Sequence, residues 1–364
     1  MRVRARTLLA TAIVLVAGAI PAHAVGTPTP VKTSKAFEWL PAGGTDGVNT
    51  YFAWTQDIIG RPKAPDSAFF QVGSGPAHRI NPGGTYGFMG DFDAGTSTLA
   101  YQQSAGPNSD IRLFDVNTRT FGTTPPGINN TAWQWSPTVD TESGTTWVFY
   151  GENRFNGPTA PWRIYLFNAT THSKLLLDSA TNRCACIFPG DIAYPWVVWS
   201  KGLMGNVWRY NIVTHAKNKV VLPFDRDEYF ASVTADGTVY VAQAGEQCGT
   251  LARLYRVTYP AGVSTPTLLY ALPTGSEPLS VSAFDTGAGV TLYSDRYFCA
   301  AKTSNIFKID GADTATRPLR AASATTEVRR TAATSRAWLR IRRSSLRCEA
   351  SGRCRPAPRA AASG

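Results

Sequence analysis

The sequence has 364 residues, of which 43% are hydrophobic, 11% aromatic and 17% charged, and its formal charge is +11 at pH 7. That charge comes entirely from the two ends, because residues 25–320 hold 23 basic and 23 acidic residues. A neutral, aromatic-rich body excludes a disordered chain, and it lacks the basic stripe of a nucleic-acid-binding surface.

The first 24 residues have the layout of a secretory signal peptide. Three arginines precede an apolar run, Leu8–Ile20, and Ala22-His23-Ala24 supplies a cleavage site. This run is shorter than the ~20 residues needed to span a bilayer, and no later stretch approaches that length. We expect export to the extracellular, periplasmic or cell-wall space and no transmembrane segment; the alternative is a retained N-terminal anchor. Residues 25–35 are expected to form a linker.

A turn containing Asp, followed by aromatic and β-branched residues, recurs six times along the chain. Successive aspartates are 47, 47, 51, 45 and 49 residues apart, at Asp46, Asp93, Asp140, Asp191, Asp236 and Asp285. This regular spacing, without helical periodicity, predicts a repeated four-stranded unit. We interpret the six aspartates as turn-forming residues on one rim, because Asp accepts hydrogen bonds from nearby backbone N–H groups.

A further strand and a hairpin follow in each repeat. The predicted strands are 68–72, 111–116, 163–167, 207–212, 253–257 and 305–309. His172 and His215 lie in such hairpins and His78 in another repeat, so we expect turn histidines and no shared zinc ion.

Units of about 48 residues with four strands are typical of propeller blades. The sequence therefore predicts an all-β fold, a six-bladed β-propeller of four-stranded antiparallel blades over residues 36–320. The outer strand of the sixth blade is left open: it comes either from residues 314–320 or from the segment before Phe37.

The repeats resemble those of the TolB-like six-bladed propellers. Asp191–Ser200 and Asn206–Thr214 carry the likeness best, with the sequences DIAYPWVVWS and NVWRYNIVT. The resemblance covers nearly the whole predicted body, and it implies a scaffold of WD40-like repeats without the N-terminal domain of TolB. It implies no particular activity, because a fold does not determine function and no G-x-S-x-G elbow is present.

Loops between the second and third strands of the blades carry the residues that we expect on a ligand-binding face, opposite the rim of aspartates. The polar candidates are Asp57, Gln103, Glu152, Asn153, Arg154, Lys201, Gln243, Asp295 and Arg296. The aromatic candidates are Trp54, Trp133, Trp135, Trp162 and Tyr194. For each aromatic residue the alternative is a place in the core between blades, where propeller sheets pack through large side chains.

Four of the six cysteines lie in the body of the chain. Cys248 and Cys299 fall in the same loop of adjacent repeats, which favours a disulfide between them, although spacing alone leaves three pairings for four cysteines and 15 for six. Cys184 and Cys186 favour a structural bridge over a redox or metal pair, because an exported thiol pair becomes oxidised and no further metal ligands lie nearby. The sequence predicts no metal site and no cofactor.

Residues 321–364 differ in composition from everything before them. They contain ten Arg, no Lys and two acidic residues. One interpretation is a basic tail that binds an anionic surface. The favoured one is a disordered end unrelated to the propeller, from an altered reading frame in a GC-rich gene, with a local bridge between Cys348 and Cys354.

Two classes of function remain. The favoured hypothesis is non-catalytic binding of a protein, a peptide or an envelope glycan by a secreted monomer, with no nucleic-acid partner. The alternative is an extracellular carbohydrate-active enzyme, a glycoside hydrolase or lyase, that uses carboxylates in the propeller funnel. Convergence of Asp57, Glu152 and Asp295 around the central channel would favour the enzyme, and outward-pointing carboxylates would favour the binding module.

Overall fold

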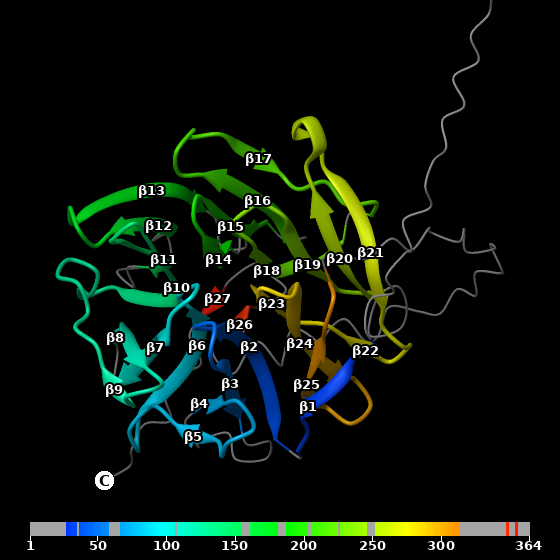
Figure 1. Ribbon diagram of the computed structural model, residues 1–364, viewed down its shortest axis with the longest axis horizontal. Coiled ribbons are helices and arrows are strands. Elements are labelled where there is room, and N and C mark those ends of the chain that lie inside the picture. Colours follow the sequence, from blue (N-terminus) through cyan, green and yellow to red (C-terminus); the bar gives the residue numbers. More distant parts are fainter. Residues whose placement is uncertain are drawn as a thin grey trace, which may run out of the picture.

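The computed structural model describes residues 27–34, 36–57, 66–105, 108–153, 161–180, 187–202, 205–224, 226–245 and 252–312, and two short strands at 347–348 and 354–355. Within these residues the chain forms strands and one short 3-10 helix, η1 (Pro260–Gly262). Figure 1 shows the strands as sheets arranged around a central axis. The predicted all-β class is therefore confirmed.

Antiparallel pairing groups consecutive strands into four-stranded units, numbered here along the chain. Unit 1 contains β2 (Phe37–Thr45), β3 (Thr50–Asp57), β4 (Ser67–Val72) and β5 (His78–Arg79). Unit 2 contains β6 (Tyr86–Phe92), β7 (Thr98–Ala105), β8 (Asn108–Asp115) and β9 (Thr120–Phe121). Unit 3 contains β10 (Trp133–Glu142), β11 (Thr145–Asn153), β12 (Trp162–Asn168) and β13 (Ser173–Ala180).

The second half of the chain continues the pattern. Unit 4 contains β14 (Ile187–Ala193), β15 (Trp196–Lys201), β16 (Asn206–Asn211) and β17 (Lys217–Lys219). Unit 5 contains β18 (Glu228–Val233), β19 (Val239–Gln243), β20 (Arg253–Thr258) and β21 (Thr265–Ala271). Unit 6 contains β23 (Val281–Asp285), β24 (Val290–Phe298) and β25 (Thr303–Ile309), and β22 (Ser276–Glu277) pairs with the end of β24.

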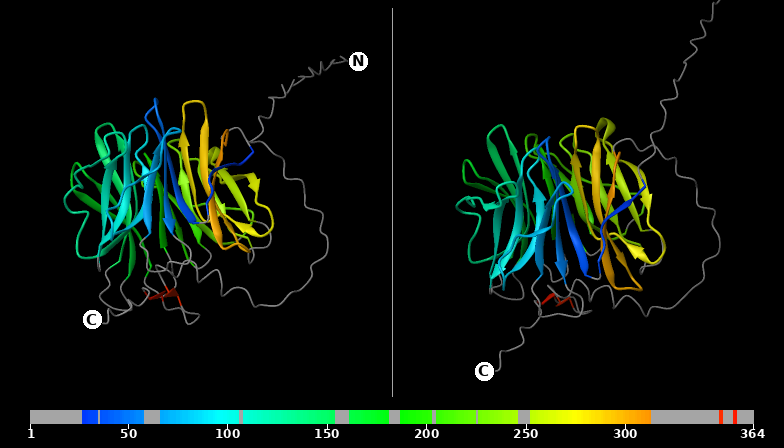
Figure 2. Two further views of the ribbon diagram at one scale, coloured as in Figure 1. Left: turned by 90° about the horizontal axis from the view of Figure 1, so that it is seen from below. Right: turned by 60° about the horizontal axis from the view of Figure 1, so that its bottom comes forward.

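The fourth strand of unit 6 comes from the other end of the fold. β1 (Thr29–Lys32) pairs antiparallel with β25, with Thr29 opposite Lys308. Figures 1 and 2 show β1, in dark blue, beside β25, in orange. The segment before Phe37 therefore supplies this outer strand, and part of the stretch expected to be a linker is a strand. The six strands predicted after the Asp turns correspond to β4, β8, β12, β16, β20 and β25.

The hydrophobic core is divided among the interfaces between units. Along β15, Val197 and Trp199 pack with residues of unit 3, whereas Val198 packs with residues of unit 5. Successive side chains of a strand point to opposite faces, so a strand between two units is apolar on both faces. Phe52 and Trp54 of unit 1 pack on aromatic residues of unit 6, so the last unit contacts the first. Sheets that pack face to face around an axis form a β-propeller.

Two further strands lie outside the units. β26 (Arg347–Cys348) pairs antiparallel with β27 (Cys354–Arg355), and this register places Cys348 opposite Cys354. The two cysteines are thus neighbours across a short ladder, and the bridge expected between them remains a prediction.

Candidate functional site

Asp295, one of the predicted site carboxylates, holds units 6 and 1 together. Its side chain is completely buried and accepts hydrogen bonds from the backbone N–H groups of Leu279 (2.8 Å) and Ser280 (2.7 Å). The Ser280 hydroxyl (3.0 Å) and the Leu40 N–H of β2 (3.4 Å) also donate to it. Burial raises the pKa of Asp295 to about 6, although these donors oppose the shift. Asp295 therefore joins units 6 and 1 through buried hydrogen bonds.

Glu152, on β11, is also engaged within the chain. Its carboxylate forms an ion pair of 2.6 Å with Lys174 of β13 and accepts a hydrogen bond of 3.0 Å from the side-chain amide of Asn130. The Lys174 ammonium also lies 3.8 Å from the centre of the Tyr165 ring. Glu152 thus joins β11 to β13 through Lys174 and to Asn130 within unit 3.

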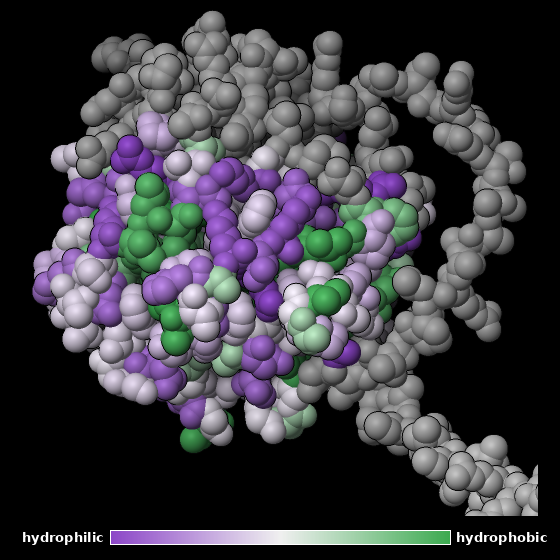
Figure 3. Space-filling model, turned by 90° about the horizontal axis from the view of Figure 1, so that it is seen from above, coloured by the Kyte–Doolittle hydropathy of each residue, from purple (hydrophilic) through white to green (hydrophobic). Residues whose placement is uncertain are grey.

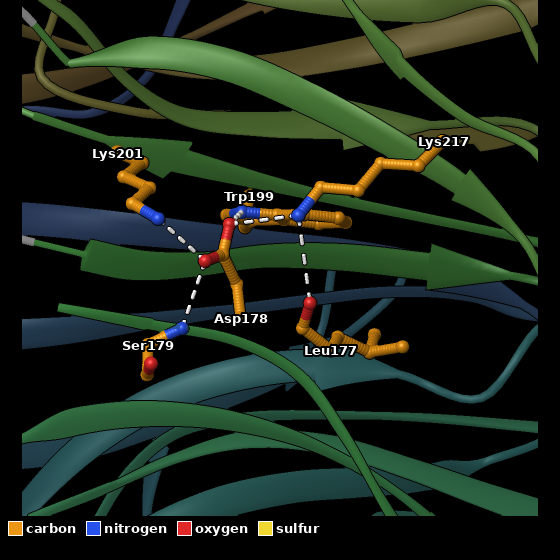
Figure 4. Close-up of polar contacts among 6 residues, drawn as sticks. All are labelled: Leu177, Asp178, Ser179, Trp199, Lys201 and Lys217. Carbon is orange, nitrogen blue, oxygen red and sulfur yellow. Dashed lines mark hydrogen bonds and ion pairs between the residues drawn. The ribbon is translucent and has the colours of Figure 1, made fainter.

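Lys201, another predicted site residue, fastens unit 4 to unit 3 (Figure 4). Its ammonium lies 2.5 Å from Asp178 of β13, and Lys217 of β17 binds the other carboxylate oxygen at 3.0 Å. The indole N–H of Trp199 also donates to Asp178, at 3.1 Å. Burial opposes the shift, but hydrogen bonds from the two lysines lower the pKa of Asp178. This cluster is a clamp between units.

The remaining polar candidates are spread over several units. The amide of Gln243 is buried and donates to the Phe224 carbonyl at 2.9 Å. Gln103 accepts a hydrogen bond from the Tyr101 hydroxyl at 2.7 Å, and the Arg296 guanidinium donates to the Tyr270 hydroxyl at 3.0 Å. Two further candidates differ in placement: Asn153 is buried at the end of β11, and Arg154 lies outside the described residues.

The aromatic candidates lie in the core. Trp54 and Trp135 are buried, and Trp133, Trp162 and Tyr194 are partly buried against the hydrophobic cluster between units 3 and 4. Figure 3 shows the edge of the molecule that carries β13, β17 and β21, where hydrophobic groups are separated by hydrophilic ones. The structure therefore favours the core interpretation for these five aromatic residues.

The six repeated aspartates fall into two groups. Asp46, Asp236 and Asp285 accept hydrogen bonds from N–H groups two residues ahead, as expected of turn residues. Asp93, Asp140 and Asp191 instead accept hydrogen bonds from the backbone of the next unit, at Thr141, Tyr194 and Val233 respectively. The prediction of turn formation is wrong for Asp140 and Asp191, which lie within β10 and β14. Asp93 does begin a turn, because its carbonyl accepts the N–H of Thr96 at 3.1 Å, and its side chain also joins units 2 and 3.

One level of the inner strands β2, β6, β10, β14, β18 and β23, which Figure 1 shows nearest the axis, is polar and buried. Five of these strands contain an irregularity in register at or directly before this level. The residues at this level, here called the polar ring, are Asp91, Thr138, Asp191, Ser232 and Ser282, with Ala42 in the corresponding place of unit 1.

Hydrogen bonds connect members of the polar ring across units. Ser232 donates to Asp191 at 2.5 Å and accepts the N–H of Ala283 at 2.9 Å. Ser282 donates to Asp91 at 3.1 Å and accepts the N–H of Gly43 in β2 at 3.0 Å. Asp91 belongs to unit 2 and Ser282 to unit 6, so this bond spans unit 1, where Ala42 occupies the corresponding place.

The two carboxylates of the polar ring interact with each other. Burial raises the pKa of Asp91 well above its ordinary value, and the charge of Asp191 raises it further. Burial likewise raises the pKa of Asp191, against the hydrogen bonds from Ser232 and Val233. Two like charges that share a buried site disfavour simultaneous ionisation, so this pair holds protons at a pH where exposed aspartates have lost them.

Sequence reasoning missed Asp91 and misassigned Asp191, although one signal marks both. The dipeptide Gly-Asp occurs only twice, at Gly90-Asp91 and Gly190-Asp191. A Cβ at Gly90 would overlap the carbonyl oxygen of Pro137, and one at Gly190 would lie 2.5 Å from the carbonyl oxygen of Ala231. Glycine at both places therefore lets the next inner strand approach closely.

Asp57, the last residue of β3, lies near a second carboxylate. Asp66, which precedes β4, is buried, and burial together with the charge of Asp57 raises the pKa of Asp66 to about 8. Asp57 itself is half-buried. The residues between them lie outside the described part of the chain.

Of the four cysteines in the body of the chain, only Cys299 lies within the described residues. Cys299 takes part in a disulfide bond, and its expected partner Cys248 lies outside the described residues, as do Cys184 and Cys186. The described residues contain no group of three or more His, Cys, Asp or Glu arranged to hold a metal ion. Nor does the described part of the chain contain a helix long and apolar enough to cross a membrane.

Similarity to known proteins is found at the level of solved structures, at low sequence identity. No family model and no curated protein matches the sequence. A neuraminidase-like protein from A/bat/Guatemala/164/2009 has 10% identity, with 81% of this chain and 96% of that chain covered and a TM-score of 0.50. TolB from Acinetobacter baumannii has 11% identity, covering 75% and 78%, with a TM-score of 0.44. The α-L-arabinofuranosidase Arb93A from Fusarium graminearum has 11% identity, covering 80% and 98%, with a TM-score of 0.46.

Proposed function

We propose that the chain is an exported, six-bladed β-propeller that binds a protein, a peptide or an envelope glycan without catalysing a reaction. In this proposal units 1 to 6 are the blades, the acting form is a monomer and no nucleic acid takes part. The signal-peptide pattern supports export. The contacts of unit 6 with both β1 and unit 1 support a closed ring.

The observation that carries the proposal is the state of two carboxylates expected to do chemistry. Asp295 accepts four hydrogen bonds from its own chain, and Glu152 is paired with Lys174. A glycosidase needs two carboxyl groups that face the scissile bond from opposite sides. Since neither side chain is available for that role, binding by the loops between second and third strands is the better supported function.

One observation favours the alternative, a carbohydrate-active enzyme. The pKa of Asp66 is raised to about 8, so Asp66 stays protonated at neutral pH beside the half-buried Asp57. Glycosidases use a protonated carboxylic acid together with a second carboxyl group. In this second proposal Asp66 is the general acid and Asp57 the partner carboxylate.

A glycan and peptide array probed with the mature chain, residues 25–364, tests both proposals. The binding proposal predicts that a subset of spots retains the protein and that mass spectrometry finds the retained ligands intact. The double variant Asp57→Asn/Asp66→Asn is then expected to process nothing, like the parent. Release of sugar by the parent and its loss in that double variant would replace the binding proposal with the enzyme.

A further inference from the structure

The hydroxyl of Thr138 departs from the pattern of the polar ring. Ser232 and Ser282 each accept a backbone N–H from the following unit, from Ala283 and Gly43 respectively. By the same pattern, Thr138 in unit 3 should accept the N–H of Ile192 in unit 4. That N–H donates instead to Asp191 Oδ1, at 2.7 Å.

Thr138 is consequently left with an unused, buried hydroxyl. The residue is 3% exposed, and its Oγ1 has no hydrogen-bond partner among the described residues. Thr138 and Asp140 lie on the same side of β10, because side chains alternate along a strand, and Asp140 contacts Tyr194 of unit 4. The Thr138 side chain therefore lies on the face of β10 that is turned toward unit 4, at the level of Asp191.

Asp91 lies on β6, in the unit before that of Thr138, and the Ser282 hydroxyl donates to its carboxylate at 3.1 Å. Its Oδ1 accepts the N–H of Phe92 at 2.8 Å, so the carboxylate is fixed to its own strand as Asp191 is. Asp91 and Asp191 are both buried, and the charge of Asp191 raises the pKa of Asp91. Asp91, Thr138 and Asp191 therefore come from three consecutive inner strands and share one level of the ring.

We propose that Asp91, Thr138 and Asp191 bind one divalent cation of the size of Ca²⁺ in the polar ring. Carboxylate and hydroxyl oxygens are hard donors, which Ca²⁺ prefers, and its flexible coordination suits ligands from separate strands. The two carboxylates balance the charge of the ion. A bound cation also removes the cost of burying two like charges together.

Calcium content and thermal unfolding of the mature chain test this site. After dialysis against CaCl2 and then against metal-free buffer, we expect about one calcium per chain by elemental analysis. Calcium is expected to raise Tm relative to EDTA in a concentration-dependent way, because it binds only the folded chain. MgCl2 at the same concentration is expected to raise Tm less, since Mg²⁺ demands stricter geometry.

Three variants separate the site from general effects on stability. Asp191→Asn is expected to weaken calcium binding on the order of 100-fold, and the near-isosteric Thr138→Val on the order of 10-fold. Asp295→Asn changes a buried carboxylate outside the ring and is expected to keep the parent affinity. Asp191→Asn replaces a carboxylate by an amide of equal size, and Thr138→Val provides a second test if Asp191→Asn does not fold.

Three results would overturn the proposal. The first is a parent chain that retains no calcium and shows no calcium-dependent change in Tm. The second is parent-like affinity in Thr138→Val, which would assign the unused hydroxyl to a buried water alone. The third is an equal loss of affinity in Asp295→Asn, which would show that calcium responds to stability and not to the ring.

Discussion

Carboxylates near the inner strands and carboxylates near the outer strands are held by different partners. Asp191 and Asp295 accept hydrogen bonds from backbone N–H groups and serine hydroxyls, and burial raises the pKa of each. Asp178, on the outer strand of unit 3, is paired with Lys201 and Lys217, and its pKa is lowered. A lysine keeps its ammonium near water while its stem packs on apolar surface, so it suits the outer strands better than the axis.

The largest expected effect comes from removing an inner carboxylate. Asp295→Ala leaves two backbone N–H groups and a serine hydroxyl buried without an acceptor, at about 1–3 kcal/mol each. We expect the free energy of unfolding to fall by about 3–5 kcal/mol, measured by urea denaturation. Asp295→Asn keeps one acceptor and should lose less; equal loss in both variants would contradict the role given to these hydrogen bonds.

Above about pH 4, the free energy of unfolding should change with the ionisation of the inner carboxylates and not with that of Asp178. Asp140 and Asp295 have folded pKa values of about 6, above 3.8 in the unfolded chain, so the folded state binds more protons between these values. These two groups stabilise the folded state fully below about pH 4. As pH rises through 6 this stabilisation is lost, which lowers the free energy of unfolding by about 3 kcal/mol for each group. Asp178, with its lowered pKa, loses its contribution only at lower pH.

Denaturation in EDTA at pH 4.5, 6 and 8 measures this trend. The parent should become less stable as pH rises, and Asp140→Asn should flatten the change between pH 4.5 and 6 because the amide does not titrate. An increase in the parent's stability over this range would show that the inner carboxylates ionise without cost.

The smallest expected effect lies in the outer clamp. Lys201 and Lys217 are about one-third exposed in their side chains, and partly exposed ion pairs contribute about 0.2–1 kcal/mol. Lys201→Met and Lys217→Met should each reduce stability by no more than about 1 kcal/mol, and added salt should reduce the difference from the parent. A loss above about 2 kcal/mol in either variant would show that the clamp contributes to stability on the same scale as the inner carboxylates.

Much of the fold could be predicted because its signals are local. Alternating apolar residues and turn residues mark β4, β8, β12, β16, β20 and β25 without knowledge of their neighbours. The strand β1 could not be chosen in the same way, since its four residues are mostly exposed and its partner, β25, is distant in the chain. Its place depends on tertiary pairing, which local propensity does not encode.

The candidate site was harder to predict because its side chains are defined by distant partners. Asp191 follows the same spacing as Asp46, but its acceptor atoms meet Ser232, in the next unit. Asp295 looks like a loop residue on a functional face, yet it is completely buried between units 6 and 1. Residue type and spacing predict which strand carries a carboxylate, whereas its hydrogen-bond partners depend on the neighbouring sheet.

The pairing of β1 with β25 also sets the order in which the molecule can be completed. Thr29 lies opposite Lys308, so the first strand leaves the ribosome long before its partner has been synthesised. Contacts this far apart in sequence form slowly, because the loop between them must close first. Until then unit 6 lacks its outer strand, and the open edge of β25 can pair with another chain.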